Sequence, residues 1–462
     1  MPHSPSPLET GDGNWLAPTL QVPSGAQARV EIPGSKSLTN RYLLLAALAD
    51  SPSLIHAPLH SRDSALMIGA LKALGAQVEE LETSSPFGPD LRVTPLNFSD
   101  KTPRQVSLDV GLAGTVMRFV PPLAALLAGS FHFDGDPHAR KRPMLPIIQA
   151  LRDLGLDVDD QGLGALPFTL HSPGSVSHQK ISIDASGSSQ FLSALLLVAC
   201  RFEGGLTISH QGKPIPSMPH IEMTLELMRQ VGITVDSSQQ MSWTVAPGSF
   251  PGFEVTVEPD LSNAGPFLAA ALVTGASVSI PHWPAQTTQG GNHWLEILPQ
   301  FGAQLRLEDG QLTVTGPQGG SQAGFPGLDL DLSEAGELAP TLAALMALSP
   351  EPGRIRGIAH LRGHETDRLA ALTQEICRLG GQAEEREDGI EILAPVSRGA
   401  LMQTYQDHRM ATAAAIIGLA QQGVVVENVA TTSKTLPNFT GLWQAMIDQW
   451  LSPEDQQGRE QG

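Results

Sequence analysis

Apolar, helix-forming segments recur along the chain, and each is opened by a small or polar residue. These opening residues are Asn40, Thr115, Ser189, Asn263, Glu337 and Asp407. The successive gaps between them are 75, 74, 74, 74 and 70 residues. Self-similarity at a fixed period indicates a repeated unit of structure, and this period is longer than that of ordinary solenoid repeats. We therefore expect six copies of a unit that contains several elements.

A second pattern has a similar period and indicates that the repeated unit is α/β. Helical segments are closed by glycine and followed by alternating apolar residues, which is typical of a helix C-cap that leads into a strand. These glycines are Gly75, Gly155, Gly232, Gly302 and Gly380. Period-two alternation predicts strands at 27–31, 180–184, 206–210, 253–257, 311–315 and 424–428. Six copies divide most simply into two lobes of three, with the midpoint near 258–263.

Arginines occur where they are least expected, near the starts of the apolar helices. Arg41, Arg118 and Arg409 follow the opening residues closely, and Arg368 opens a further helix. The N-terminus of a helix already carries a partial positive charge, so cations are normally disfavoured there. One such arginine would be a solvated surface residue. The recurrence instead favours several helix N-termini that converge on an anion.

Composition narrows the function classes. The net charge of −19 argues against nucleic acid or an anionic membrane as the main partner. Apolar residues at 41% and charged residues at 16% are typical of a globular protein. Cys200 and Cys377 lie in apolar helical segments, which favours buried thiols over a metal site or a disulfide. No pattern indicates a metal or an organic cofactor, so none is expected.

Both ends of the chain are predicted to lie outside the fold. Residues 1–20 have no apolar core, so we expect a disordered tail rather than a signal peptide. Residues 451–462 are predicted to be a polar C-terminal tail. The longest apolar run, 191–200, is about half as long as a bilayer-spanning helix. A cytoplasmic location is expected.

The strongest local motif is PGSKSLTNR at 33–41. Its glycine and serines expose backbone and hydroxyl donors at a helix start, while Lys36 and Arg41 add positive charge. This combination suits a phosphate or a carboxylate. The spacing is not that of a Walker phosphate-binding loop.

Seven further motifs follow in order, and together with the first they resemble the 5-enolpyruvylshikimate-3-phosphate synthase family from about residue 20 to 450. The motifs are GLAGTVMRF (111–119), RKRPM (140–144), SGSSQFLSALL (186–196), KPIPSMPHIEMT (213–224), GHETDRL (363–369), DHRMA (407–411) and SKTLP (433–437). The resemblance implies an α/β fold of two lobes, each with three βαβαββ-type units (an inside-out α/β barrel), that close on substrate at the inter-lobe cleft. Lobe 1, on the phosphoenolpyruvate side, would comprise 21–33 and 258–450. Lobe 2, on the shikimate 3-phosphate side, would comprise 34–257.

The resemblance also implies a reaction. Members of this family transfer the enolpyruvyl group of phosphoenolpyruvate to the 5-hydroxyl of shikimate 3-phosphate and release phosphate, by addition and elimination through a tetrahedral intermediate. The step belongs to the shikimate pathway, which leads to chorismate and the aromatic amino acids, and the enzyme is the target of glyphosate. The expected partners are these two small molecules, without nucleic acid or membrane, and the expected state is a monomer.

Site residues follow from the motif positions. The implied shikimate 3-phosphate contacts are Lys36, Ser37, Arg41, Ser188, Ser189, Gln190, Ser217, Glu337 and His364. The implied phosphoenolpyruvate contacts are Lys36, Gly114, Arg142, Gln190, Arg368, Arg409 and Lys434. Glu337 corresponds to the base that takes the hydroxyl proton. Either Glu365 or Lys36 would protonate the methylene carbon. Without the resemblance, each serine is equally a helix cap and Glu337 is more simply a helix-dipole partner.

Two other functions are compatible with this fold. The related UDP-N-acetylglucosamine enolpyruvyl transferase usually carries a reactive cysteine in a flexible glycine-rich loop, and neither Cys200 nor Cys377 has such a setting. A non-catalytic sugar-phosphate-binding protein would be expected to lack the carboxylates Glu337 and Glu365, which are both present. One departure from the family pattern is His364, because many members have lysine at that position. Histidine titrates near neutrality, so the charge of this contact depends on pH.

Overall fold

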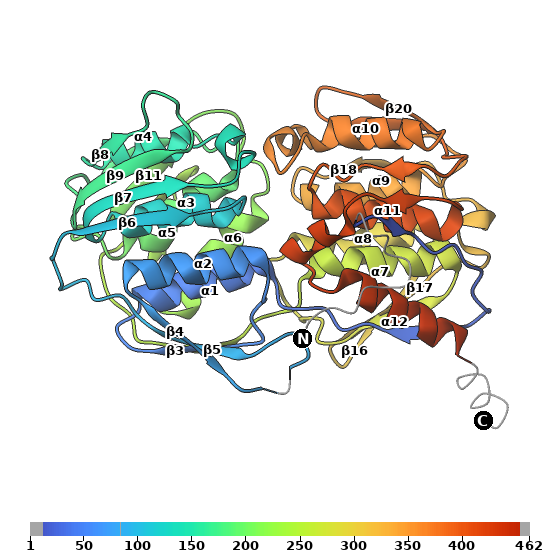
Figure 1. Ribbon diagram of the computed structural model, residues 1–462, viewed down its shortest axis with the longest axis horizontal. Helices are drawn as coiled ribbons and strands as arrows, with labels where there is room; N and C mark the ends of the chain where they lie inside the picture. The colour runs from blue at the N-terminus through green and yellow to red at the C-terminus, as the bar shows by residue number, and fades with distance from the viewer. Residues whose placement is uncertain (1–12, 84, 453–462) are drawn as a thin grey trace. The chain divides into compact units, whose positions relative to one another are not determined.

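The chain forms two α/β units, and the computed structural model describes residues 13–83 and 85–452 (Figure 1). Unit 1 comprises Met1–Ile32 and Pro259–Gly462, and unit 2 comprises Pro33–Glu258. The sequence predicts crossings near residues 33 and 258. Each unit has its own hydrophobic core.

The second copy in unit 2 has the complete βαβαββ pattern. Its elements are β6 (Arg104–Asp109), α3 (Gly114–Ala124), β7 (Ala128–Asp134), α4 (Leu145–Asp153), β8 (Asp157–Asp159) and β9 (Phe168–Pro173), with a short 3-10 turn at Ala139–Lys141. The sheet order is β6-β7-β9-β8, in which β6 and β7 are parallel and the other pairs are antiparallel. The crossover between parallel strands is therefore a helix, and a hairpin closes the copy.

One further copy in each unit repeats this order of strands and α-helices. The copy in unit 2 consists of β10 (Lys180–Ile183), α5 (Ser189–Ala199), β11 (Leu206–His210), α6 (Pro219–Gln230), β12 (Val235–Asp236) and β13 (Ser242–Val245). The copy in unit 1 consists of β18 (Asp329–Asp331), α9 (Ala339–Met346), β19 (Gly353–Arg356), α10 (Arg368–Arg378), β20 (Gln382–Glu385) and β21 (Ile390–Ala394). Their sheet orders are β10-β11-β13-β12 and β18-β19-β21-β20.

The two copies next to the crossings exchange their first strands. In unit 2, β14 (Glu254–Thr256) pairs in parallel with β3 (Ser53–His56), although it comes after all the other strands of that unit. In unit 1, β2 (Gln27–Arg29) pairs in parallel with β15 (Ser277–Ile280). The other elements are α1 (Lys36–Leu48), α2 (Arg62–Leu74), β4 (Gln77–Leu81) and β5 (Asp90–Thr94) in unit 2, and α7 (Leu261–Thr274), α8 (Trp294–Ile297), β16 (Gln304–Glu308) and β17 (Gln311–Thr315) in unit 1.

The sixth copy borrows a strand from the N-terminal segment, which corrects the prediction of a disordered tail at 1–20. The copy consists of β22 (Leu401–Met402), α11 (His408–Ala420), β23 (Val425–Val426) and α12 (Phe439–Leu451). β1 (Trp15–Leu16) pairs antiparallel with β23, and the Trp15 side chain is buried beside Phe439. Burial of this indole fixes the segment in place. Residues 1–12 lie outside the described residues, as do 453–462 of the predicted C-terminal tail, whereas Leu451 ends α12.

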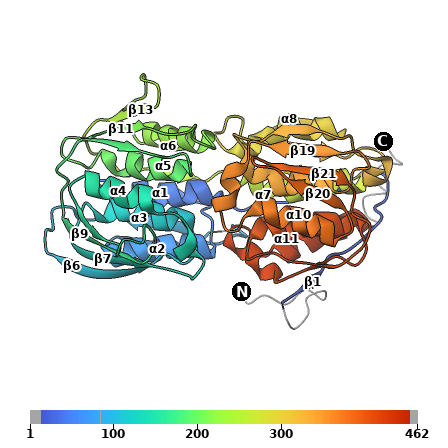
Figure 2. The same ribbon diagram turned by 90° about the horizontal axis from the view of Figure 1, so that it is seen from above.

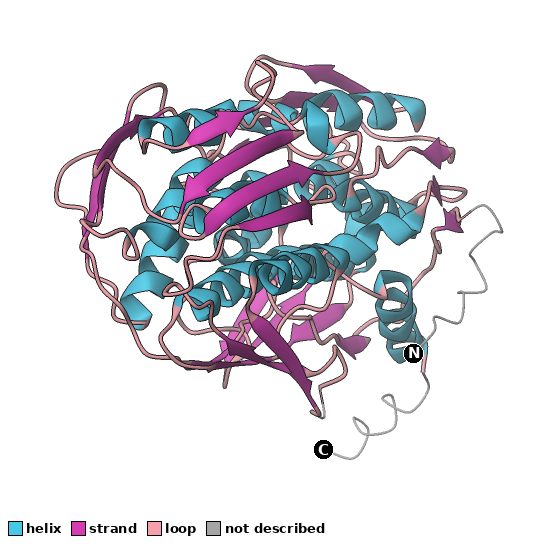
Figure 3. Ribbon diagram, turned by 60° about the vertical axis from the view of Figure 1, so that its left-hand side comes forward, coloured by secondary structure: helices cyan, strands magenta, loops and turns pink. Residues whose placement is uncertain are grey.

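The helices that follow the first strands form the centre of each unit. In unit 2, α1, α3 and α5 contact one another, and in unit 1, α7, α9 and α11 do the same. Figures 2 and 3 show the sheets outside these helices. Helices that are apolar on all sides are expected to be buried, and every residue of α1 from Leu38 to Leu48 is buried.

The glycine C-caps are confirmed. Gly75, Gly155, Gly232, Gly302 and Gly380 have φ values of 111°, 88°, 88°, 87° and 82°. This left-handed conformation ends a helix at little steric cost only for glycine.

The two cysteines differ in exposure. Cys200 is buried as expected, but the expectation is wrong for Cys377, which is exposed on the outer side of α10. Within residues 13–83 and 85–452, no cluster of three or more His, Cys, Asp or Glu side chains has an arrangement suited to a metal ion. In the same part of the chain, no helix is both long and apolar enough to cross a membrane.

Candidate active site

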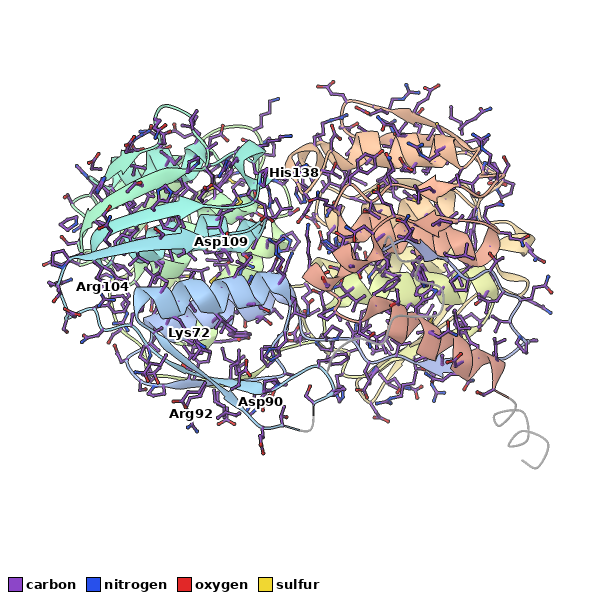
Figure 4. All side chains as sticks on the ribbon, in the orientation of Figure 1. Lys72, Asp90, Arg92, Arg104, Asp109 and His138 are labelled. Atoms are coloured by element: carbon purple, nitrogen blue, oxygen red, sulfur yellow. The ribbon has the colours of Figure 1, made fainter. Side chains whose placement is uncertain are left out.

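Within each unit, the site residues implied by the motifs lie in the segments where a strand of a copy leads into the next helix. In the second copy, β6 begins at Arg104 and ends at Asp109, as Figure 4 shows, and α3 begins shortly after that end. Ligand sites of α/β sheets commonly lie outside the carboxyl ends of parallel strands. The exposed N–H groups of the helix starts add to the attraction for anions.

Lys36 is the first residue of α1 and lies beside a carboxylate that the sequence did not single out. Its Nζ is 3.5 Å from Asp63 Oδ2, and Asp63 is buried in the first turn of α2. Ser35 caps α1 by accepting a hydrogen bond from Leu38 N. The carboxylate of Asp63 therefore balances the charge of a partly buried ammonium at a helix start, where a cation is normally disfavoured.

Arg41 is a buried cation whose contacts are with neutral groups. Its Nε donates to Thr224 Oγ1 at 2.8 Å, and its Nη atoms donate to the carbonyls of Ser37 and His220 at 3.1 and 3.2 Å. The guanidinium also lies 5.2 Å from the ring centre of Phe119. Burial lowers the pKa of Arg41 to about 9. An anion bound beside Arg41 would offset this cost of desolvation.

Arg118 orients the start of α5. Its Nη1 donates to Gln190 Oε1 at 2.8 Å and lies 3.4 Å from Ser188 Oγ, while its guanidinium lies 4.9 Å from the ring centre of Phe191. Ser188 also caps α5, because its side chain accepts a hydrogen bond from Gln190 N. The capping interpretation of this serine is thus correct, and it does not exclude a ligand contact. The sequence places Arg118 in the arginine pattern, and the resemblance places it beside the implied phosphoenolpyruvate contacts.

Two further predicted phosphate contacts are buried serines. Ser189 is the first residue of α5, and Ser217 precedes α6 with a φ of 53°. A left-handed conformation at a residue other than glycine is uncommon and often marks a functional site.

Gly114 permits a close approach of Arg142 to the start of α3. A Cβ atom at position 114 would lie 3.0 Å from Arg142 Nη2 and 3.1 Å from Gln190 Oε1. Arg142 Nη1 donates to the Leu112 carbonyl at 2.9 Å, and within the described part of the chain the buried Nε has no hydrogen-bond partner. A buried donor without a partner is costly, so Arg142 is well suited to an anionic ligand.

In unit 1, Arg368 is enclosed by carboxylates. Its Nε donates to Asp407 Oδ2 at 2.8 Å and its Nη2 to Glu365 Oε2 at 3.0 Å, and its side chain is only 2% exposed. Burial acts to lower the pKa of Arg368, but the charges of Asp407 and Glu365 outweigh it and the pKa is raised. Arg368 is therefore a permanent cation. The sequence identified Asp407 only as a helix opener and missed this ion pair.

Arg409 and Lys434 are held on the same side of unit 1 as Asp407. The Arg409 N–H donates to Asp407 Oδ1 at 2.9 Å, so Asp407 is also the N-cap of α11. Burial and, next, the charge of Arg368 lower the pKa of Arg409. Lys434 is buried and its Nζ donates to the Gln406 carbonyl at 2.6 Å. Cations that disfavour one another would be stabilised by a bound anion.

The two predicted catalytic carboxylates of unit 1 both act on these arginines. Glu337 lies in a 3-10 turn at Gly336–Leu338 and does not head α9 directly, which corrects the predicted helix start. The charge of Glu337 acts to raise the pKa of Arg368 and of Arg409. His364 Nδ1 lies 3.4 Å from Arg368 Nη1 and 4.0 Å from Glu365 Oε2. His364 and Glu365 are therefore parts of one charged cluster.

The predicted residues divide between the units. Unit 2 carries Lys36, Ser37, Arg41, Gly114, Arg142, Ser188, Ser189, Gln190 and Ser217. Unit 1 carries Glu337, His364, Glu365, Arg368, Arg409 and Lys434. Within each unit, buried or half-buried cations with polar neighbours predominate. The chemistry that this set favours is the binding of phosphate and carboxylate groups next to carboxylates able to exchange protons.

A sequence model of the family described as EPSP synthase (3-phosphoshikimate 1-carboxyvinyltransferase) matches residues 20–443. The chain belongs to the EPSP synthase family. A protein named 3-phosphoshikimate 1-carboxyvinyltransferase from Kocuria rhizophila is 57% identical over 437 residues, which cover 94% of this chain and 97% of that protein.

Solved structures show the same fold. A structure of EPSP synthase from Acinetobacter baumannii matches with a TM-score of 0.73 and 22% identity, and covers 94% of this chain and 97% of its own. A second EPSP synthase structure from that organism matches with a TM-score of 0.72 and 21% identity. The predicted two-lobe α/β class is thereby confirmed.

Proposed function

We propose that this protein transfers the enolpyruvyl group of phosphoenolpyruvate to the 5-hydroxyl of shikimate 3-phosphate and releases inorganic phosphate. The observation that carries the proposal is the match of almost the whole chain to a relative of that name at 57% identity. The two substrates together present two phosphates and two carboxylates. A set of buried arginines and lysines in an acidic protein suits these phosphates and carboxylates, because arginine binds both groups in bidentate geometry.

The proposed binding roles follow the motif positions. Arg41 and the serines Ser188, Ser189 and Ser217 would contact shikimate 3-phosphate, with Ser37, Gln190 and His364 beside them. Gly114, Arg142, Arg368, Arg409 and Lys434 would surround phosphoenolpyruvate. Support comes from the burial of Arg41, Arg142, Arg368 and Lys434. It also comes from the lowered pKa values of Arg41 and Arg409 and from the carboxylates that raise the pKa of Arg368. Desolvated cations interact strongly with anions because the local dielectric is low.

The proposed chemistry is an addition followed by an elimination. Glu337 takes the proton of the 5-hydroxyl of shikimate 3-phosphate as the hydroxyl oxygen bonds to C2 of phosphoenolpyruvate. Glu365 or Lys36 gives a proton to the methylene carbon. Loss of that carbon's proton and departure of phosphate then restore the double bond. Lys36 in unit 2 lies beside Asp63, whereas Glu365 in unit 1 is hydrogen-bonded to Arg368. Both candidate proton donors therefore have an oppositely charged neighbour, and the two assignments stay alternatives.

A phosphate-release assay tests the proposal. Purified protein is expected to release phosphate from phosphoenolpyruvate only when shikimate 3-phosphate is added. Parallel reactions would contain UDP-N-acetylglucosamine in its place, or no acceptor. Release with the UDP sugar alone would assign the protein to the related transferase. Tight binding of both proposed substrates without any release would instead indicate a binding protein. A monomer in the cytoplasm is part of the proposal, and sedimentation of the purified chain tests the monomer.

A further inference from the structure

The short segment between β22 and α11 has an unusual backbone. Tyr405 and Gln406 are consecutive residues with φ values of 54° and 57°. Residues with a Cβ atom disfavour this left-handed region. Such conformations persist where the surrounding structure holds them, and they cluster at functional sites. The next residue, Asp407, begins the charged cluster of unit 1 described above.

A buried carboxylate on α10 holds this turn in place. Glu375 is 0% exposed, and its Oε1 accepts a hydrogen bond from the Tyr405 hydroxyl at 2.7 Å. Its Oε2 accepts from Gln403 N at 3.0 Å and from Arg378 Nε at 2.9 Å. Burial and the Glu375 hydrogen bond raise the pKa of Tyr405 to about 12. The phenol therefore keeps its proton and remains a donor to Glu375 at all working pH values.

The turn delivers polar groups to the predicted phosphoenolpyruvate contacts. The Gln406 carbonyl accepts the hydrogen bond of Lys434 Nζ, and the adjacent Asp407 carboxylate accepts from Arg368 and from Arg409 N. A left-handed Gln406 sets the direction of its carbonyl, because φ and ψ fix the plane of the following peptide. A change at Tyr405 would thus alter the oxygen that orients Lys434.

Helix α10 contacts the segment at two points on one face. Arg368 and Glu375 are seven residues apart, which is close to two turns of an α-helix. Arg368 binds Asp407 at one end of the segment, and Glu375 binds Gln403 and Tyr405 at the other. The sequence indicates no role for Glu375 or Tyr405, because neither lies in a recognised motif.

We propose that Glu375 and Tyr405 are positioning residues that hold Lys434 in place for phosphoenolpyruvate by fixing the Tyr405–Gln406 turn. This inference rests on the proposed function. Neither residue is required to touch a substrate. Glu375 and Tyr405 contribute to the affinity for phosphoenolpyruvate and not to that for shikimate 3-phosphate, because the groups that they orient are predicted to contact only phosphoenolpyruvate.

The substitution Tyr405→Phe tests the inference, and the chain provides a matched control. Its only other tyrosine is Tyr42, whose hydroxyl donates to Gln230 in unit 2. Tyr405→Phe is expected to raise the KM for phosphoenolpyruvate about fivefold and to leave kcat and the KM for shikimate 3-phosphate within about twofold. Tyr42→Phe is expected to change none of the three constants. Equal effects of the two substitutions, or an unchanged KM for phosphoenolpyruvate, would overturn the proposal.

A double-mutant cycle with Lys434→Ala separates positioning from a general structural effect. If Tyr405 acts through Lys434, Tyr405→Phe has little further effect on the KM for phosphoenolpyruvate once Lys434 is absent. Additive effects would contradict that route. If Tyr405→Phe does not fold, Glu375→Gln provides the same measurements. Absence of all activity in the parent protein would instead refute the proposed function, so the two failures are distinguishable.

Discussion

The substitution Gly290→Ala offers a selective way to move Glu337 without changing it. Gly290 is buried and begins a short 3-10 turn at Gly290–His293 in unit 1. A Cβ atom at this position would lie well inside van der Waals contact with Glu337 Oε1, and 3.3 Å from Cδ of the same side chain. The nearest atoms all belong to the end of a flexible side chain. The substitution should therefore be absorbed by a shift of the carboxylate rather than by the backbone.

The size of the effect follows from the contact. To restore ordinary van der Waals separation, the Glu337 carboxylate has to move by about 1 Å, and a misplacement of about 1 Å can reduce a rate about 100-fold. A positioned general base contributes about 10²–10⁴-fold. We therefore expect Gly290→Ala to lower kcat by about 100-fold and to change both KM values much less. The midpoint of thermal unfolding should remain within a few degrees of the parent value.

The assay is steady-state phosphate release at saturating concentrations of both substrates, with thermal unfolding as the test of folding. Gly69→Ala in α2 is a matched control, because a Cβ atom there would meet nothing within 4 Å. Gly291→Ala provides a contrast, because its Cβ atom would lie 2.5 Å from the backbone carbonyl carbon of Leu261 and should destabilise the fold. A Gly290→Ala protein that folds and retains kcat within about threefold of the parent would refute the role of Glu337 as the base.

Three further substitutions have expected outcomes. Glu337→Gln should lower kcat at least about 100-fold with little change in substrate binding, measured by phosphate release and by calorimetric titration of shikimate 3-phosphate; near-normal turnover would return Glu337 to a helix-dipole role. His364→Lys should keep activity and flatten the pH dependence of shikimate 3-phosphate affinity between about pH 5.5 and 7.5. Identical profiles for mutant and parent would mean that His364 either stays neutral throughout or does not touch the substrate. The hydrogen bonds that His56 donates to Asp90 and, next, to Glu254 raise the pKa of His56. The stability from this cluster is therefore fully present below the unfolded-state pKa, about 6.5, and is lost as the pH rises through the higher folded-state pKa. His56→Gln should flatten that decline in chemical denaturation, and an unchanged slope would contradict it.

The repeated elements could be predicted because their signals are local. A helix C-cap needs glycine at one position, and the five periodic glycines all have the predicted left-handed conformation. Strand alternation is also local, so 206–210 and 311–315 coincide with β11 and β17. The family fold then followed from the order of the motifs. These features depend on neighbours within a few residues, which a single sequence displays directly.

The exchanged strands could not be predicted, because strand pairing depends on partners that are distant in sequence. β14 and β2 each have an ordinary strand pattern, but nothing in either pattern specifies the sheet that it joins. The prediction of a disordered N-terminal tail failed for a related reason. Within the described residues the sixth copy has no hairpin, and β1 occupies the edge of β23 with Trp15 buried.

Among the site residues, the carboxylate partners were the least predictable. Asp63 and Asp407 occupy ordinary positions at helix starts, where acidic residues are already favoured by the helix dipole. Their ion pairs with Lys36 and Arg368 arise only from tertiary structure. The exposure of Cys377 had a partial signal, because the apolar stripe of α10 covers only one side of the helix. Near the end of a helix, the side on which a residue lies is hard to assign from the sequence, because helix boundaries are uncertain by one or two residues.

The most direct test of enolpyruvyl transfer follows the bridging oxygen of phosphoenolpyruvate. Transfer by addition and elimination breaks the bond between carbon and this oxygen, so the oxygen leaves with phosphate. Hydrolysis by attack of water on phosphorus breaks the other bond and leaves the oxygen on pyruvate. Phosphoenolpyruvate labelled with oxygen-18 at the bridging position would be incubated with the protein and shikimate 3-phosphate, and both products analysed by mass spectrometry. The predicted result is label in the released phosphate and an unlabelled enolpyruvyl ether, whereas label in pyruvate, or no dependence on shikimate 3-phosphate, would contradict the assigned reaction.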